Sequence, residues 1–182
     1  GDYFQKKGQQ FKDRAKPLRE KVDELSVAEV LRLDGLSYPE FLNAAMVFTK
    51  LLTRFPDDPL AGLAGIRSGQ NFMRALQYEK AIDVFQDIID NEEFDGGKIR
   101  AQALFWGAYS RELYPTSEDD YRTRGTMIRE AYQMYRRITF DFPDSIWAKR
   151  ARGRLADPVF ERIIEQENEA RERLIENIKS MR

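Results

Sequence analysis

The stretch TRFPDDPLAG at residues 53–62 interrupts a helical pattern with a Phe-Pro-Asp sequence, and FDFPDSIWAK at residues 140–149 repeats it. Proline does not continue a helix, because it lacks the backbone N–H and its ring clashes with the preceding turn. In the first copy, Asp58 and Pro59 have the form of an N-cap and a pre-organised first helical residue. The two copies therefore predict two places where one helix stops and the next begins.

The helices that precede these stops share a spacing. Each carries a small residue, an aromatic residue four positions later and an aliphatic residue three positions after that. A third copy lies between them, with Glu93 in the place of the proline. The three copies are Ala44, Phe48 and Leu51; Ala81, Phe85 and Ile88; and Ala131, Tyr135 and Ile138. Such residues share one helix face, and the small one lets a neighbouring helix approach closely. The pattern predicts a buried face that recurs along the chain.

The recurring face resembles the second helix of the tetratricopeptide repeat, a 34-residue pair of antiparallel helices with A-x3-F and a closing proline. In the middle copy the resemblance extends to the first helix, because Gly69 and Phe72 lie at the family's Gly and Tyr positions. Gly107 and Gly153 match the Gly position of two further first helices. The resemblance covers residues 26–156. It implies an all-α solenoid of about three to four helix pairs, closed by a long C-terminal capping helix.

The match departs from the family in several places. Gly65 stands at the Trp position of the middle copy, and residues 26–34 are a poor first helix for the first copy. Capping-box sequences at Ser26 and Ser37 predict two separate helix starts there. About twelve residues are inserted at 114–125, YPTSEDDYRTRG, which we expect to form an exposed loop. We therefore expect helix pairs near 26–56, 59–92 and 98–142.

Two flanks lie outside the repeats. For residues 1–25 the sequence predicts a basic amphipathic lead-in segment, followed by a helix that starts at Pro17. The lead-in either packs its aromatic residues on the first repeat or lies close to a membrane. Residues 157–182 read as a charged capping helix, with a coiled-coil helix as the alternative. The start at Gly1 rather than Met predicts that an upstream segment was removed, and such a segment could have held a targeting signal or a membrane anchor.

The amino-acid composition excludes several classes of function. The 182 residues include 30 basic and 31 acidic side chains, and the net charge of −1 argues against a general nucleic-acid binder. No apolar run approaches the roughly 20 residues that span a bilayer. The absence of cysteine and histidine excludes zinc fingers, disulfides and catalysis by those side chains.

Catalytic, cofactor and metal sites are not expected. The acidic stretch at 89–97 lacks the alternating oxygen ligands of an EF-hand loop and is explained as a connection between repeats. The glycines of LAGLAGIRSG follow no strand and precede no Gly-Lys-Ser/Thr sequence, so they do not form a phosphate loop. Any pair of carboxylates chosen from 31 acidic residues is unremarkable. We do not expect an enzyme.

Stacked helix pairs offer a concave surface built from their first helices. Registers fixed on Gly69, Gly107 and Gly153 place polar and aromatic side chains there, and we expect them to bind a partner. These residues are Gln70, Arg74, Arg111, Trp147, Arg150 and Arg154. Arginines beside an aromatic plate suit an acidic or carboxylate-bearing segment, although the same arginines are also explained as solvated helix faces.

The resemblance implies a protein–protein interaction scaffold that binds a partner protein or peptide in the groove. The two Phe-Pro-Asp turns look like those of bacterial envelope tetratricopeptide proteins, such as the lipoprotein of outer-membrane β-barrel assembly, which implies a periplasmic or envelope-associated location. A cytoplasmic location is the alternative. The alternative function is a self-assembling helical spacer. A monomer is expected from the first function and a defined oligomer from the second.

Overall fold

The computed structural model describes residues 1–19, 24–91, 94, 97–117 and 120–165, and these residues form helices and turns without any strand. The chain is therefore all-α, as the sequence predicts. The elements are α1 (Asp2–Ala15), η1 (Lys16–Leu18), α2 (Glu24–Arg54), α3 (Ala61–Arg74), α4 (Tyr78–Asp90), α5 (Lys98–Glu112), α6 (Tyr121–Asp141), α7 (Ile146–Leu155) and η2 (Pro158–Phe160).

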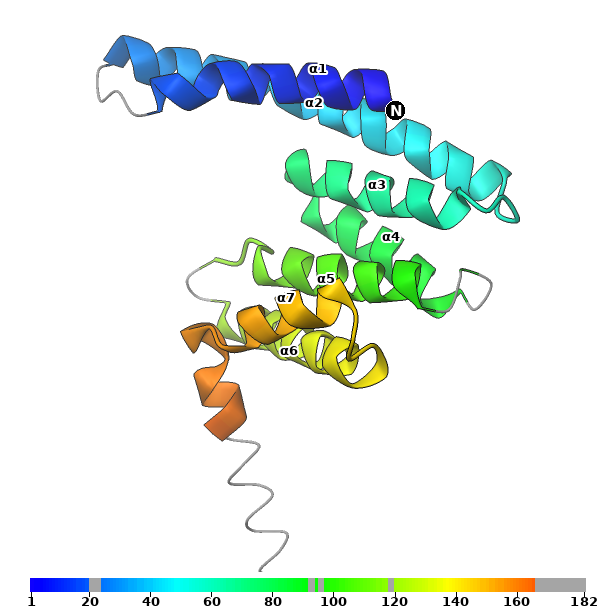
Figure 1. Ribbon diagram of the computed structural model, residues 1–182. Helices are drawn as coiled ribbons and strands as arrows, with labels where there is room; N and C mark the ends of the chain where they lie inside the picture. The colour runs from blue at the N-terminus through cyan, green and yellow to red at the C-terminus, as the bar shows by residue number, and fades with distance from the viewer. Residues whose placement is uncertain (20–23, 92–93, 95–96, 118–119, 166–182) are drawn as a thin grey trace, which may run out of the picture.

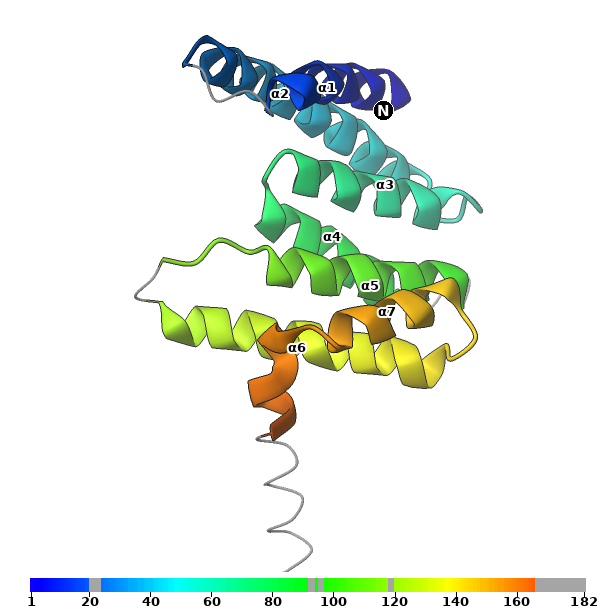
Figure 2. The same cartoon turned by 60° about the vertical axis from the view of Figure 1, so that its left-hand side comes forward.

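The helices are stacked in chain order, as Figures 1 and 2 show. Each helix packs against the next one along the chain, from α1 to α7. Substantial contacts between helices two apart occur at α3 with α5 and at α5 with α7, in the part of the chain that is described. The odd-numbered helices therefore come together on one side of the stack, while α2, α4 and α6 lie on the other.

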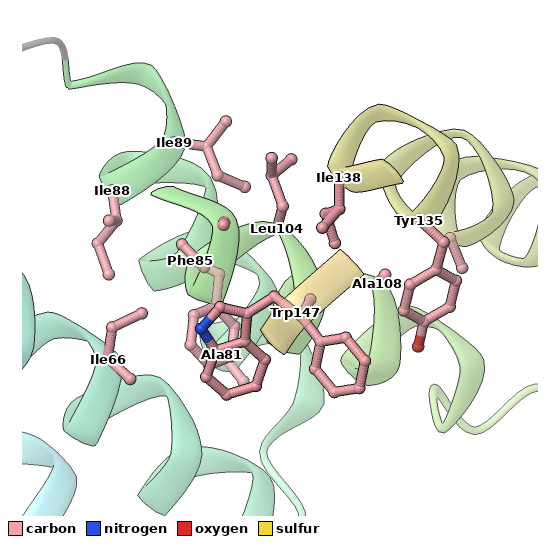
Figure 3. Packing of buried hydrophobic residues seen from close by; sticks show 14 of the residues in the cluster. Ile66, Ala81, Phe85, Ile88, Ile89, Leu104, Ala108, Tyr135, Ile138 and Trp147 are labelled. Atoms are coloured by element: carbon pink, nitrogen blue, oxygen red, sulfur yellow. The ribbon is translucent and has the colours of Figure 1, made fainter. Parts of the chain in front are cut away.

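The repeated helix face forms the core between these layers. Phe85, Ile88, Tyr135 and Ile138 are fully buried. Figure 3 shows Ile88 of α4 on the side of Ile66 of α3, and Tyr135 and Ile138 of α6 near Ala108 and Leu104 of α5. The Phe85 ring lies so close to Gly69 that a Cβ atom there would be 2.4 Å from the ring. Small residues opposite aromatic rings thus set the distance between neighbouring helices.

One member of the repeated face does not follow the prediction. Leu51 is 43% exposed, whereas its counterparts Ile88 and Ile138 are both 0% exposed. The other two members of that copy, Ala44 and Phe48, are buried. All three positions are therefore buried in the second and third copies, whereas only two of the three are buried in the first copy.

The expected pair of helices at 26–56 is a single helix. α2 runs from Glu24 to Arg54 with Pro39 inside it, so neither Ser26 nor Ser37 starts a new helix. The side chain of Ser37 instead donates a hydrogen bond to the carbonyl oxygen of Asp34 at 2.7 Å. α1 packs along α2 on both sides of Pro39, and this tertiary packing keeps the helix continuous.

The N-terminal segment is the helical partner of α2. α1 ends at Ala15, before Pro17, so the prediction of a helix that starts at Pro17 was wrong. Lys7 pairs with Glu40 at 2.6 Å and Lys12 pairs with Asp34 at 2.8 Å, in an antiparallel arrangement of the two helices.

The insertion at 114–125 is only partly a loop. α6 begins at Tyr121, and the Asp120 side chain caps it by accepting a hydrogen bond from the Thr123 N–H at 3.1 Å. The second half of the insertion thus lengthens α6 to 21 residues, against 13 in α4. Of the predicted C-terminal helix, η2 and a short helical stretch to residue 165 are described, and residues 166–182 lie outside the described residues.

Candidate interaction surface

Two stripes of exposed or half-buried side chains run along α3 and α5 with the same spacing of four, three and four residues. The stripe on α3 is Leu63, Arg67, Gln70 and Arg74, and the stripe on α5 is Gln102, Trp106, Tyr109 and Leu113. Both lie on the side where the odd-numbered helices come together. We call this face the α3–α5–α7 surface.

A cavity of about 290 Å³ lies between the two stripes. It is lined by Gln70, Met73, Arg74, Trp106, Tyr109 and Leu113. The Arg74 guanidinium carbon lies 5.5 Å from the centre of the Phe41 ring. Among the described residues Arg74 has no carboxylate partner, and the buried Trp106 Nε1–H has no hydrogen-bond acceptor. The cavity therefore combines apolar and aromatic walls with the Arg74 guanidinium, which has no carboxylate partner among the described residues.

α7 extends this surface with an arginine stacked on an aromatic ring. The Arg150 guanidinium carbon lies 4.7 Å from the centre of the Trp147 ring. Trp147 is itself buried, with its ring centre 5.3 Å from that of Phe105 and 6.2 Å from that of Trp106. Trp147 thus anchors α7 on α5, and the exposed Arg150 is the group that it presents to solvent.

Arg154 belongs to a polar network that joins three helices. It forms an ion pair with the buried Glu112 of α5, which also accepts a hydrogen bond from the Tyr135 hydroxyl of α6. Burial and the hydrogen bond to Glu112 raise the pKa of Tyr135, so the phenol stays protonated. The hydrogen bond that Arg154 donates to Glu112 raises the pKa of Arg154. Arg154 is therefore first of all a structural residue, although its guanidinium also lies 5.8 Å from the Tyr109 ring.

Arg111 lies away from the α3–α5–α7 surface, contrary to the groove position that the sequence predicts for it. It is buried, and its Nε donates to Glu130 Oε2 at 2.8 Å while its Nη1 donates to the Gly107 carbonyl at 3.3 Å. Gly107 faces α6, because a Cβ atom there would lie 2.8 Å from Met134. This pairing with α6 leaves Arg111 unable to extend a groove shared with Arg74.

A register shift of one residue explains the misplacement. The prediction aligned Gly69 with Gly107, whereas the exposed stripes align Gln70 with Tyr109 and Arg74 with Leu113. One residue turns a helix by about 100°, which is enough to move a side chain to a neighbouring face. Sequence reasoning consequently missed Trp106, Tyr109 and Leu113.

Of the six residues predicted to bind a partner, Gln70 and Arg74 line one cavity, and Arg150 is exposed on α7 beyond it. Trp147 and Arg154 border the same surface but hold α7 in place. The surface is basic, since its acidic neighbours are already paired: Asp2 with Arg67 at 2.7 Å and Glu112 with Arg154.

The described part of the chain contains no cluster of acidic residues that could hold a metal ion. Within the same residues, no helix combines the length and apolar character that crossing a membrane requires. Comparisons of the sequence with protein-family models and with curated proteins, and of the structure with solved structures, give no match.

Proposed function

We propose that the chain is a tetratricopeptide-like scaffold that binds an acidic segment of a partner protein on the α3–α5–α7 surface. The observation that carries the proposal is the cavity between α3 and α5. There Arg74, which has no carboxylate partner among the described residues, lies beside the aromatic side chains of Trp106 and Tyr109. Arginine, tryptophan and tyrosine are the residue types that dominate binding hot spots. A guanidinium next to aromatic rings favours a carboxylate that carries an apolar neighbour.

The stacking supports the same proposal. In a solenoid of helix pairs, the first helices converge on the concave side and the second helices diverge on the convex side. The contacts of α3 with α5 and of α5 with α7 follow this arrangement. The α3–α5–α7 surface is then the concave one, which such scaffolds offer to a peptide or a helix.

Site-specific photo-crosslinking tests the proposal. A photoreactive amino acid replaces Gln70, which lines the cavity, and in a matched control it replaces the exposed Arg129 of α6. We expect the first position to capture an acidic protein segment and the control position not to. The double substitution Arg74→Glu and Arg150→Glu should abolish that capture without changing the melting temperature.

Equal capture at both positions, or capture that survives the double substitution, would refute binding at this surface. The self-assembling spacer stays the alternative, and the mass of the purified chain in solution separates the two functions. A monomer fits the scaffold, whereas a defined oligomer fits the spacer. The proposed periplasmic or envelope location rests only on the resemblance of the two Phe-Pro-Asp turns to those of bacterial envelope proteins.

A further inference from the structure

Arg111 of α5 is a buried charged residue on the side of the stack that α4 and α6 form. In the register that aligns Gln70 with Tyr109, its counterpart in α3 is Phe72, an apolar core residue. Burying an ion pair costs desolvation energy, and well-packed apolar residues in its place are often equally or more stable. Stability alone therefore gives little reason for an arginine at this position.

The contacts of Arg111 within the fold use only part of its guanidinium. Its Nε donates to Glu130 Oε2 at 2.8 Å, and the Glu130 side chain is half exposed. Its terminal nitrogens reach the Gly107 carbonyl oxygen at 3.3 Å and Gln86 Oε1 at 3.4 Å, which is longer than most N–H···O hydrogen bonds. A guanidinium has more N–H donors than these contacts take up. The terminal nitrogens of Arg111 therefore have donors to offer a ligand.

Arg111 borders a cavity of about 420 Å³, which we call the α4–α6 cavity. α4 and α6 both pack on α5 but make no substantial contact with each other among the described residues, and the cavity lies between them. Its apolar lining consists of Ile89 of α4, Leu104 of α5 and Met134 of α6. Figure 3 shows Ile89 and Leu104 near one another. The volume falls within the range of small-ligand sites.

The polar lining of the α4–α6 cavity favours an anion. Arg137 and Gln133 of α6 join the buried arginine there, and Glu130 is the one acidic residue among those that line the cavity. Arg137 donates from Nε to Asp141 Oδ2 at 3.1 Å, and its terminal nitrogens have no partner among the described residues. The lining thus carries two guanidinium groups against a single carboxylate.

We propose that the α4–α6 cavity binds a carboxylate that is attached to an apolar group. The terminal nitrogens of Arg111 and Arg137 hold the carboxylate, because a guanidinium binds this group through two parallel N–H···O bonds. The apolar group covers Ile89, Leu104 and Met134 and removes them from water. The ligand is either a small free acid or the C-terminal residue of a peptide. This site is separate from the α3–α5–α7 surface and does not rest on the function proposed for that surface.

Titration with N-acetyl-leucine, followed by NMR, tests the proposal. Its matched control is N-acetyl-leucinamide, which has the same shape without the charge. We expect the signals of the Met134 methyl and the Gln133 side-chain amide to shift on binding. The acid should bind at least about tenfold more tightly than the amide, because hydrogen bonds between charged groups are the strong ones. Equal affinity for the two compounds, or no shift of these two signals, overturns the proposal.

A third compound distinguishes the two sources of the carboxylate. The tetrapeptide Gly-Gly-Gly-Leu carries the same terminal group on a longer chain. If it binds as tightly as N-acetyl-leucine, the site accepts the end of a peptide. If it binds several-fold more weakly, the ligand is a small free acid.

Substitutions in the lining check which groups hold the carboxylate. Arg111→Met should remove the advantage of the acid over the amide and leave the melting temperature nearly unchanged, because the α3 counterpart is apolar and the half-exposed Glu130 stays hydrated. Glu130→Gln should strengthen binding of the acid several-fold, since it removes the carboxylate that competes for Arg111. Arg129→Gln removes a positive charge from α6 outside the lining and should have no effect.

Binding of N-acetyl-leucine that survives Arg111→Met, or that falls as much with Arg129→Gln, overturns the proposal. If Arg111→Met does not fold, Arg137→Gln takes its place, because Arg137 is exposed. That variant should weaken binding of the acid several-fold and leave binding of the amide unchanged. An equal effect on both compounds would show that Arg137 does not recognise the carboxylate, which also refutes the site.

Discussion

At the residue scale, the contact of Phe85 with Gly69 decides how closely α3 and α4 approach. Phe85 is fully buried, and its ring fills the space that a side chain at position 69 would need. Phe85→Ala should lower the free energy of unfolding by about 3–5 kcal/mol, because truncation of a buried phenylalanine leaves a cavity. Urea denaturation measures this loss. A loss under about 1 kcal/mol would show that the ring is not a core residue.

Two arginines of α7, Arg150 and Arg154, differ in how much they contribute to the stability of the fold. The sequence places both Arg150 and Arg154 on a solvent-facing groove surface, where a reversal of charge would cost little stability. The structure corrects this, since Arg154→Glu would place a carboxylate against the buried Glu112. We expect Arg154→Glu to lower the free energy of unfolding by about 2–4 kcal/mol, as the loss of a partly buried ion pair does. Arg150→Glu should stay within about 0.5 kcal/mol.

Thermal and urea unfolding of the two single variants, prepared side by side, compare these effects. The variants carry the same charge change four residues apart on one short helix, so each serves as the control for the other. Equal stability of both would mean that the network of Arg154, Glu112 and Tyr135 contributes nothing to the packing of α7.

At the element scale, α2 shows where local signals yield to packing. Pro39 removes one backbone hydrogen bond from a 31-residue helix. Pro39 itself is exposed. The buried Phe41, two residues later, packs tightly on Gly8 of α1, because a Cβ atom on Gly8 would lie 2.9 Å from the Phe41 ring. Pro39→Ala should raise the free energy of unfolding by about 1–3 kcal/mol, since the missing bond is restored.

The melting temperature of the Pro39→Ala variant measures this gain. Hydrogen exchange in α1 gives the control, because it should be unchanged if the helix keeps its path. A lower melting temperature together with faster exchange in α1 would show instead that α1 needs the bend that proline introduces into α2.

The sequence predicts the ends of helices well where a proline followed by a capping residue interrupts the backbone hydrogen bonds of the helix. Both Phe-Pro-Asp sequences fall between helices, with α2 ending at Arg54 and α6 at Asp141. The Ser37-Tyr-Pro-Glu40 sequence carries equally strong local signals and yet lies inside α2. The difference is tertiary: α1 covers α2 on both sides of Pro39, and no pattern within residues 26–56 contains that information.

The candidate site was harder to predict than the core, for a geometric reason. A prediction of the buried residues of a helix tolerates a register error of one position, because several neighbouring positions face the core. A surface stripe does not tolerate such an error. The alignment of Gly69 with Gly107 pairs Gln70 with Ala108 and Arg74 with Glu112, instead of with Tyr109 and Leu113. Gln70, Arg74 and Arg150 do lie on the α3–α5–α7 surface, because their registers did not depend on Gly107.

At the scale of the whole molecule, contacts are local along the stack. Each helix packs mainly on its neighbours in sequence, and α2 makes no substantial contact with α6 among the described residues. In such an arrangement stability approximates a sum of terms for each unit and for each interface between units. The two ends should therefore open independently, at free energies set by their own interfaces.

Hydrogen exchange of two core truncations tests this independence. Phe41→Ala removes a buried ring of α2, and Ile138→Ala removes a buried side chain of α6. The first should speed exchange in α1 and α2 and leave α6 and α7 unchanged, whereas the second should do the reverse, because a disturbance passes only through shared interfaces. Mass spectrometry of exchanged fragments, at a temperature well below the melting point of both variants, resolves the helices separately. If either truncation speeds exchange equally along the whole chain, the stack opens as one cooperative unit. A partner held at the α3–α5–α7 surface would then have to stabilise the entire molecule rather than the helices that it touches.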